Sequence, residues 1–244
     1  MRSGLKLWPG WAWSRRQRAW GIALGEHAVT LVSVGRTAAD PVRVLQTLSL
    51  WPPDGAVALD SHHVWLVERL REASAQEVRR HRRLVLALPM SRCQSGQLDA
   101  PAAMAADALH AEVQLEAAQR LNVSPQEVSF DYAVLKADPP TPPQVQWLAC
   151  LLSEVQAWRQ HTRAAGWRLP AIEHHEQAAW RAAQALRGGT VNLQAQPHQD
   201  WQFDWPAPAE RAGDGTLLAA LQPLRGSPAW DCLCACGAGL RALS

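Results

Sequence analysis

Several features of secreted, membrane-spanning and disulfide-rich proteins are missing from this sequence. No window of about 18 residues is apolar and free of charge and proline, so we expect no transmembrane helix. The start of the chain is interrupted by Pro9, Gly10 and the Arg15–Arg18 cluster, which argues against a secretory signal. The five cysteines are odd in number and lack framework spacing, which argues against a disulfide scaffold. Together these absences predict a cytoplasmic protein.

Aromatic residues other than tryptophan are scarce, and common catalytic motifs are absent. The chain has one tyrosine and two phenylalanines beside thirteen tryptophans. It shows no Ser/His/Asp order, no Walker loop and no dinucleotide-binding glycine fingerprint. Its 244 residues are 48% hydrophobic and 19% charged, which is typical of a folded protein with one large or two small domains.

The first part of the chain is basic and rich in tryptophan. Residues 1–36 hold six basic residues and one acidic residue, whereas the whole chain has a net charge of only +2. Trp8, Trp11, Trp13 and Trp20 lie in the same stretch. Tryptophan beside arginine suits a membrane–water interface or a protein-binding hot spot, so residues 1–19 are a candidate for peripheral membrane contact. The alternative is a loosely ordered tail whose tryptophans pack partly on the domain.

A strand, a glycine turn and a second strand are predicted over Trp20–Gly35. Apolar and small residues run to Leu24, Gly25 breaks the run, and the apolar pattern resumes over Ala28–Val34. The next expected elements are a strand (Val42–Leu50), a helix (His62–Val78, with Ser61 as N-cap), a strand (Arg83–Leu88), a helix (Met104–Leu121), two strands (Val128–Leu135 and Val145–Leu151), a helix (Ser153–Ala165), a strand (Trp167–Ile172) and a helix (His174–Leu186). A capping box at Ser124–Glu127 predicts one short turn. This order indicates a mixed α/β layer structure with a small insertion.

Two groups of potential metal ligands are present, and we interpret both as structural. The run Glu173–Glu176 reads Glu-His-His-Glu, but adjacent residues of a helix point about 100° apart, so we expect a polar helix start. Cys232, Cys234 and Cys236 alternate, whereas structural zinc sites mostly use Cys-x-x-Cys pairs. Here cysteine is expected to act as a small hydrophobe, and no metal site is expected.

The densest basic run, Arg79–Arg83, follows a predicted helix. Cations at a helix C-terminus suit the helix dipole, and nucleic-acid binding usually needs a wider basic face with aromatic residues. We therefore expect a solvated connection and no nucleic-acid partner.

Several ordered blocks resemble one known family. Gly21–Gly25 followed by Val29–Val32 is similar to its opening strand pair, and Leu86–Pro89 to the end of its next strand. Leu121–Tyr132 is similar to the segment that joins the helix of its inserted subdomain to a strand, and Gly237–Arg241 to its closing Gly-Leu-Ala-Leu-Arg. Through the order and spacing of these blocks, the chain resembles the PilM family of type IV pilus assembly proteins, especially its short HofM-like branch.

The resemblance implies an α/β protein with the actin-like (ribonuclease H-like) fold, a small inserted subdomain and a reduced or truncated second half. The expected parts are a basic tryptophan-rich segment (1–19), a first half (20–137) with the inserted subdomain at about 90–137, and a reduced second half with a C-terminal helix (138–244). The resemblance also implies a protein peripheral to the inner membrane that binds the short N-terminal cytoplasmic tail of a PilN-like bitopic protein and contacts other pilus assembly proteins. The groove for that tail is expected within residues 20–137.

The nucleotide chemistry of actin-like ATPases is incomplete in this sequence. Ala23 replaces the acidic residue that normally stands two positions before the turn glycine. No second phosphate-binding unit follows Leu186, and the remaining stretch is short for a complete second half. We therefore expect no catalytic residue, no metal and no cofactor. If ATP and Mg²⁺ binding is retained, the resemblance assigns it to Gly25, Gly237 and Gly239.

Three functions follow from these expectations. The leading hypothesis is a scaffold of a type IV pilus or competence machine that is not an enzyme. The second is an actin-like ATP-binding protein or ATPase of the same machinery. The third is the cytoplasmic domain of a type II secretion protein, which shares the fold but is normally fused to a membrane segment.

Overall fold

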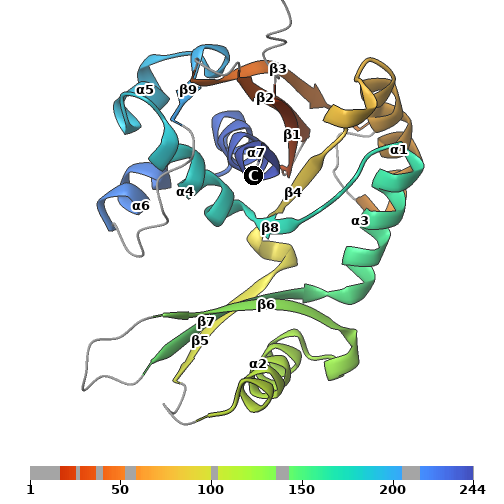
Figure 1. Cartoon of the computed structure of the whole chain (residues 1–244), viewed down its shortest axis with the longest axis vertical. Helices are drawn as coiled ribbons and strands as arrows, with labels where there is room; N and C mark the ends of the chain where they lie inside the picture. Colours follow the sequence, from red (N-terminus) through yellow and green to blue (C-terminus); the bar gives the residue numbers. More distant parts are fainter. Residues whose placement is uncertain are drawn as a thin grey trace, which may run out of the picture.

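The computed structural model describes residues 17–25, 28–36, 41–52, 59–99, 104–135, 143–204 and 215–243. They form a sheet of six strands, a sheet of three strands and the helices that cover both (Figure 1). Most of the basic segment 1–19 and most of the proline-rich stretch 138–143 lie outside these residues. None of the helices in the described ranges combines the length and apolar character needed to cross a membrane.

The larger sheet is built around the predicted strand–turn–strand unit, which is confirmed. Its strands are β1 (Gln17–Leu24), β2 (Val29–Arg36), β3 (Val42–Leu50), β4 (Leu84–Leu88), β8 (Ile172–His174) and β9 (Gln202–Phe203), in the order β8-β4-β1-β2-β3-β9. Neighbouring strands from β1 to β3 are antiparallel, whereas β4 and β8 run parallel to β1. Strands β1, β4 and β8 therefore end at the same edge of the sheet, where their C-terminal loops meet.

The two faces of the larger sheet carry side chains of different size. Large residues such as Trp20 and Leu86 pack against α1 (Leu59–Ala75) and α3 (Leu152–Ala164) on one face. Small residues such as Ala23 and Ala87 lie in the core on the other face, with α4 (His175–Ala185) and α7 (Pro228–Leu243). Because helices bury both faces of β1, β2 and β4, these three strands are buried along nearly their whole length.

Helix α7 lies close to the sheet because small residues line the contact. Figure 1 shows α7 enclosed between the larger sheet and α4. A Cβ at Gly21 of β1 would overlap the carbonyl oxygen of Ala235 in α7. The cysteines and alanines of α7 are buried on several sides of the helix, which is typical of a helix in the centre of a core.

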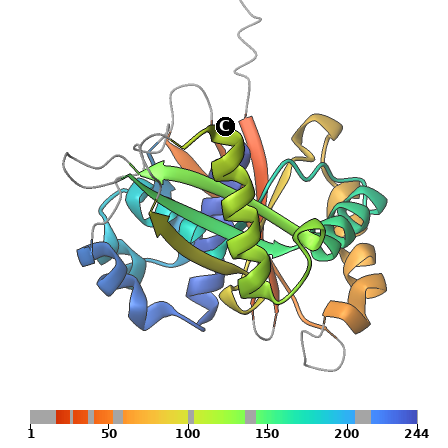
Figure 2. The ribbon, with the colours of Figure 1, turned by 90° about the horizontal axis from the view of Figure 1, so that it is seen from below.

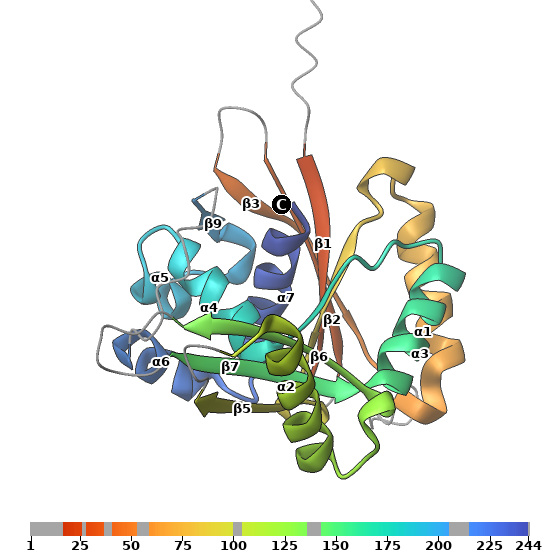
Figure 3. The ribbon, with the colours of Figure 1, turned by 60° about the horizontal axis from the view of Figure 1, so that its bottom comes forward.

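A smaller sheet is inserted between β4 and α3. Its strands are β5 (Gln94–Asp99), β6 (Val128–Leu135) and β7 (Gln144–Leu151), with β7 in the centre. Helix α2 (Ala106–Leu121) covers its outer face, where Val113 and Ala117 are buried beside Trp147 (Figure 2 and Figure 3). Because β7 pairs with both β5 and β6, the inserted unit extends to Leu151, beyond the boundary expected near residue 137.

Several predicted elements are confirmed almost residue by residue. The strands expected over Val42–Leu50 and Val128–Leu135 match β3 and β6. The capping box is present, with Ser124 and Glu127 around a single 3-10 turn. These segments carry both a clear apolar pattern and a boundary signal in the sequence.

Other boundaries differ, and several short elements are absent from the sequence prediction. Helix α1 begins at Leu59, before its expected cap Ser61. Of the strand expected over Trp167–Ile172, only Ile172 belongs to β8. Strands β5 and β9 and helix α5 (Thr190–Ala195) were not expected, because they are short or polar and lack a readable period.

The residues after the inserted unit complete the first half of the fold. Helices α3, α4 and α7 cover the larger sheet, and β8 and β9 extend it at its two edges. The part of the chain that the structure describes contains no third sheet. Within the described residues, the stretch that follows the inserted unit thus supplies helices and edge strands to the larger sheet.

Candidate functional site

A groove runs between the inserted sheet and the β8 edge of the larger sheet. It consists of two hollows of about 150 and 180 Å³ that share Asp131, Leu148 and Ile172. One wall is the inner face of the inserted sheet, and the other is formed by β8, the residues before it and the start of α4. We call this feature the inter-sheet groove.

Strand alternation decides which side chains of β6 face the groove. Phe130 and Tyr132 lie on the outer face, with ring centroids 4.7 and 6.0 Å from that of His110 in α2. Successive side chains of a strand point to opposite faces, so Asp131 and Ala133 point to the groove. The part of the inner face that β6 forms therefore presents small and polar residues.

The opposite wall contains the end strand of the larger sheet. Among the described strands, β8 pairs only with β4, through registers such as Leu86 with Ile172. Its second edge therefore has backbone N–H and C=O groups that no described strand pairs. An extended peptide can add to such an edge through main-chain hydrogen bonds.

A buried ion-pair cluster holds β8 in place. The side chain of Glu173 has no exposed surface, and its carboxylate oxygens lie 2.8 Å from Nη1 of Arg181 and 2.9 Å from Nη1 of Arg241. Arg181 also donates to the carbonyl oxygen of Gly237 at 3.2 Å. Strand β8, helix α4 and helix α7 are thereby tied together at the groove wall.

Two buried thiols lie at one end of the groove. Cys93 and Cys150 line the hollow beside Leu88 and Val155. Burial and the neighbouring groups raise the pKa of Cys93 to about 12, and burial and Glu154 raise that of Cys150 to about 11. Both thiols are therefore protonated and behave as small apolar groups.

A second site, which we call the Gly25 cleft, lies where β1 and β4 end. Its volume is about 440 Å³, and it is bounded by the first turn of the sheet, the loop after β4, and the N-termini of α4 and α7. The lining residues are Leu24, Gly25, Pro89, Met90, Ser91, Arg92, His175, Glu176, Arg225, Gly226, Trp230 and Asp231.

The backbone around Gly25 is already engaged within the protein. The N–H of Gly25 donates to the carbonyl oxygen of Ala28 at 2.9 Å. A Cβ on Gly25 would overlap a carboxylate oxygen of Asp231 and lie 2.8 Å from its Cγ. A phosphate group that approached this backbone would therefore meet a carboxylate, and the amide that points to phosphate in a cradle is used in the turn.

The cations of the cleft are paired, and its histidine is neutral. Arg92 lies 2.8 Å from Glu154, and Arg225 forms an ion pair with Glu176. Burial lowers the pKa of His175 to about 4, and its buried Nε2 has no hydrogen-bond partner. The cleft thus offers one unpartnered neutral nitrogen and little uncompensated positive charge.

A sequence profile described as type IV pilus assembly protein PilM matches residues 21–187 of the chain. This stretch covers more than half of the 244 residues. The chain belongs to the PilM family.

Solved structures extend the PilM likeness to the fold. A PilM–PilN type IV pilus biogenesis complex matches with a TM-score of 0.54 and 21% identity, over 73% of this chain and 52% of that chain. The cytoplasmic domain of EpsL, an inner-membrane component of the type II secretion system of Vibrio cholerae, gives a TM-score of 0.48 and 14% identity, over 66% and 59% of the two chains. No curated protein matches the sequence. The first likeness confirms the predicted actin-like fold, although this chain spans about half of that relative.

In this PilM family member, the glycines assigned to a nucleotide do not lie together. Gly25 lines the cleft, whereas Gly237 and Gly239 are buried in the contacts of α7 with Ala178 and with β1. Ala23 is fully buried in the core that β1 forms with α7 and α4. The two closing glycines therefore have a packing role in this structure.

The potential metal ligands of both groups make other contacts in the structure. Glu173 points to its arginines, His174 accepts a hydrogen bond from the N–H of Glu176 at 3.1 Å, and His175 lines the cleft. The cysteines of α7 are buried in the core, and burial raises the pKa of Cys234. Within the described ranges, no group of three or more His, Cys, Asp or Glu side chains could hold a metal ion.

Little of either site can be read from the sequence. A partner groove is predicted within residues 20–137, and nothing in the structure tests that prediction; the inter-sheet groove also has a wall formed by residues 169–177. His175 and Asp231 reach the cleft from elements far from Gly25 in the chain. Only the Glu173–Glu176 run signalled unusual polarity at this place.

Proposed function

We propose that the chain is a type IV pilus assembly scaffold that holds the N-terminal cytoplasmic tail of a PilN-like inner-membrane protein in the inter-sheet groove. Its membership of the PilM family supports the general role. A solved relative is a complex of PilM with PilN, which supports a partner of that class. In this proposal the protein works in the cytoplasm beside the inner membrane and contacts other pilus assembly proteins.

The observation that carries the proposal is the edge of β8 that no described strand pairs, which lies opposite a sheet face. The edge supplies backbone donors and acceptors for an extended peptide. Ile172 and Leu148 supply apolar surface within the same hollows, and Asp131 and Arg159 supply one charge of each sign. This combination favours a short extended segment with alternating side chains over a compact ligand.

A matched pair of substitutions on β6 tests the groove. Ala133 is exposed and faces the groove, whereas the next residue, Val134, is 53% exposed and faces away from it. Ala133→Arg should weaken binding of a fluorescent peptide with the first residues of the cognate PilN-like protein by at least about tenfold, as expected for a filled interface centre. Val134→Arg should change the affinity by less than about twofold.

Fluorescence anisotropy gives the Kd of both variants and of the unchanged protein. Circular dichroism melts show whether the variants fold equally well. Tight peptide binding by Ala133→Arg would place the tail elsewhere. Failure of the unchanged protein to bind the cognate peptide would overturn the proposal itself.

We also propose that the protein does not hydrolyse ATP. Ala23 lacks the carboxylate that would hold hydrated Mg²⁺, and Asp231 lies beside the glycine that would approach a phosphate. The alternative, an ATP-binding protein of the same machinery, is favoured by the size of the Gly25 cleft and by the unpartnered Nε2 of His175. Isothermal titration with Mg-ATP separates the two, because a micromolar Kd would support the alternative.

A separate question is whether the protein serves a competence machine or a type II secretion machine. The type II alternative requires a membrane segment fused to the domain, and the neighbouring genes of the source genome would show which partner exists. Binding of a peptide from an inner-membrane component of a type II secretion system, in place of a PilN-like tail, would favour that alternative.

A further inference from the structure

Arginines gather at the end of the molecule opposite the Gly25 cleft. Six of them define what we call the basic end: Arg71, Arg79, Arg80, Arg83, Arg163 and Arg168. They come from the C-terminal ends of α1 and α3, the 3-10 helix η1 (Arg79–His81), the residue before β4, and the connection from α3 to β8. Figure 3 shows these segments and the start of β1 at the same end of the molecule, away from the inserted sheet.

Backbone hydrogen bonds hold the segments of the basic end together. The N–H of Trp20 donates to the carbonyl oxygen of Arg83 at 3.0 Å, and that of Leu84 donates to Arg168 at 2.9 Å. A side-chain bond of 3.4 Å from Arg71 to the carbonyl oxygen of Ala164 joins α1 to α3. The arginines therefore occupy fixed neighbouring places on one surface.

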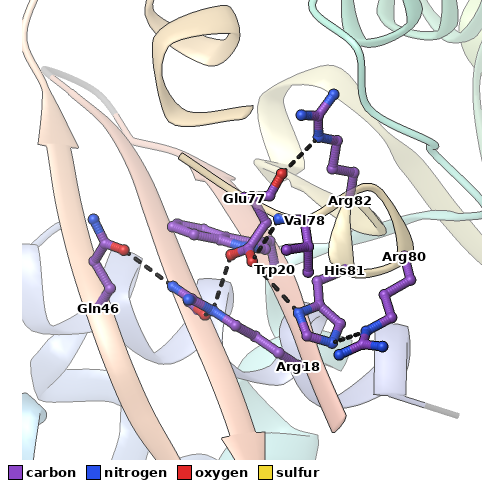
Figure 4. A network of polar contacts seen from close by, with 9 residues as sticks. Arg18, Trp20, Gln46, Glu77, Val78, Arg80, His81 and Arg82 are labelled. Carbon is purple, nitrogen blue, oxygen red and sulfur yellow. Dashed lines mark hydrogen bonds and ion pairs between the residues drawn. The ribbon is translucent and has the colours of Figure 1, made fainter. Parts of the chain in front are cut away.

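The acidic residue at the centre of the basic end, Glu77, forms its contacts inside the protein. Glu77 is 6% exposed, accepts a hydrogen bond from Nε1 of Trp20 at 3.0 Å, and pairs with Arg18 at 3.0 Å and with His81 at 3.5 Å (Figure 4). Its carbonyl oxygen accepts from Nε of Arg82 at 3.0 Å. Glu77 thus anchors η1 from below and leaves the outer arginines uncompensated.

The outer arginines of the basic end are exposed to solvent. Arg79, Arg80, Arg163 and Arg168 are exposed. None of the four forms an ion pair with a carboxylate of the described residues, and the nearby Glu72 is paired with Arg69 at 2.7 Å. Val78, which precedes η1, is 53% exposed among them. The surface therefore combines unpaired cations with an exposed apolar side chain.

We propose that the basic end docks on an anionic lipid surface. Residues 1–16, which precede β1 in the sequence, hold Arg2, Lys6, Arg15 and Arg16, no acidic residue and three tryptophans. Arginine with tryptophan and an exposed aliphatic residue fits the headgroup region of a bilayer, whereas no exposed aromatic row for stacking bases accompanies the arginines in the described part of this surface. Docking at this end leaves the inter-sheet groove free, so the inference does not depend on the peptide proposal.

Vesicle sedimentation with the full chain tests this surface. The probes are vesicles of phosphatidylcholine alone and vesicles that also contain the anionic lipid phosphatidylglycerol. Each arginine near an anionic membrane surface contributes about fivefold to binding. The double variant Arg79→Gln/Arg168→Gln should therefore bind the anionic vesicles about 30-fold more weakly. The binding should also fall as salt rises, because salt screens the attraction.

The double variant Arg120→Gln/Arg225→Gln is the matched control. It removes the same charge from the inserted unit and the Gly25 cleft, away from the basic end, and should bind vesicles within about threefold of the unchanged protein. An equal loss in both variants would overturn a localised docking surface, as would equal binding to vesicles without anionic lipid. Tighter binding to a short DNA duplex than to anionic vesicles at the same salt would overturn the choice of lipid. A circular dichroism melt like that of the unchanged protein shows that a variant which loses vesicle binding is still folded.

Discussion

Gly237 is the position at which one methyl group tests the packing of α7 most directly. A Cβ there would lie 2.9 Å from Cα of Ala178 and overlap the carbonyl oxygen of that residue. These atoms belong to the backbone of α4, so no rotamer change can relieve the overlap. In Gly237→Ala the two helices must separate, and the buried contacts between them must loosen.

Two opposing effects set the size of the change. Alanine is a better helix former than glycine by about 1 kcal/mol, which would stabilise the variant if the site were open. Overpacking a dense core costs about 1–3 kcal/mol, and more when backbone must move. Because the overlap is with backbone, we expect a net loss of about 2–3 kcal/mol in the free energy of unfolding. For a chain of this size that corresponds to a fall of roughly 5–10 °C in Tm.

Gly239→Ala supplies the comparison on the same helix. A Cβ at Gly239 would lie 2.8 Å from Cγ2 of Val34 and 3.3 Å from the backbone N of Gly21. The closest atom ends a side chain that can move, so the gain in helix propensity should offset most of the strain. We expect the stability of this variant to lie within about 1 kcal/mol of the unchanged protein.

Urea unfolding followed by circular dichroism measures both variants, and titration with Mg-ATP is run beside it. If Gly237→Ala were as stable as Gly239→Ala or more stable than the unchanged protein, the packing role would be refuted. A loss of nucleotide affinity without a loss of stability would instead return Gly237 to the ligand-binding role that the family resemblance implied.

Three further predictions concern buried groups. Arg181→Ala removes one partner of the buried Glu173 carboxylate and should cost about 3–5 kcal/mol in chemical denaturation, while adding Glu173→Leu should recover part of the loss. Because the pKa of His175 falls from 6.5 to about 4 on folding, the unfolded chain takes up a proton first, so stability should decline by up to about 3 kcal/mol between pH 6.5 and 4; urea titrations should show a smaller decline in His175→Gln. The thiols of Cys93 and Cys150 should resist iodoacetamide at pH 8 until the protein is unfolded, and rapid labelling detected by mass spectrometry would contradict their raised pKa.

The parts of the fold that could be predicted from the sequence are those in which an apolar pattern is bounded by turn residues. Strands β3 and β6 have clear apolar patterns and end at turn residues, and the Ser124–Glu127 box marks a turn through its own hydrogen bonds. The opening hairpin was identified for the same reason, since Gly25 interrupts an apolar run. Such signals are local, so neighbouring residues are sufficient to specify them.

The inter-sheet groove depends on pairings that no local pattern encodes. Ile172 of β8 pairs with Leu86 across the whole inserted unit, and β7 pairs with β5 across α2 and β6. Periodicity indicates that a strand exists but not which strand is its neighbour. Local patterns therefore cannot show that the edge of β8 and the inner face of β6 form one site. The pairing of the strands must be known first.

Helix α7, the C-terminal helix that the family resemblance implied, links the two candidate sites, and this connection explains why its sequence has no amphipathic stripe. Asp231 in its first turn lines the Gly25 cleft, while Arg241 in its last turn pairs with Glu173 and lines the inter-sheet groove. Between them the helix must fit against α4 and β1 at once, so small residues occupy several of its sides and leave no amphipathic stripe. A shift of α7 moves both ends together. Gly237→Ala should therefore weaken peptide binding at the groove even at temperatures where the variant is fully folded, whereas a change confined to Asp231 should leave the groove intact.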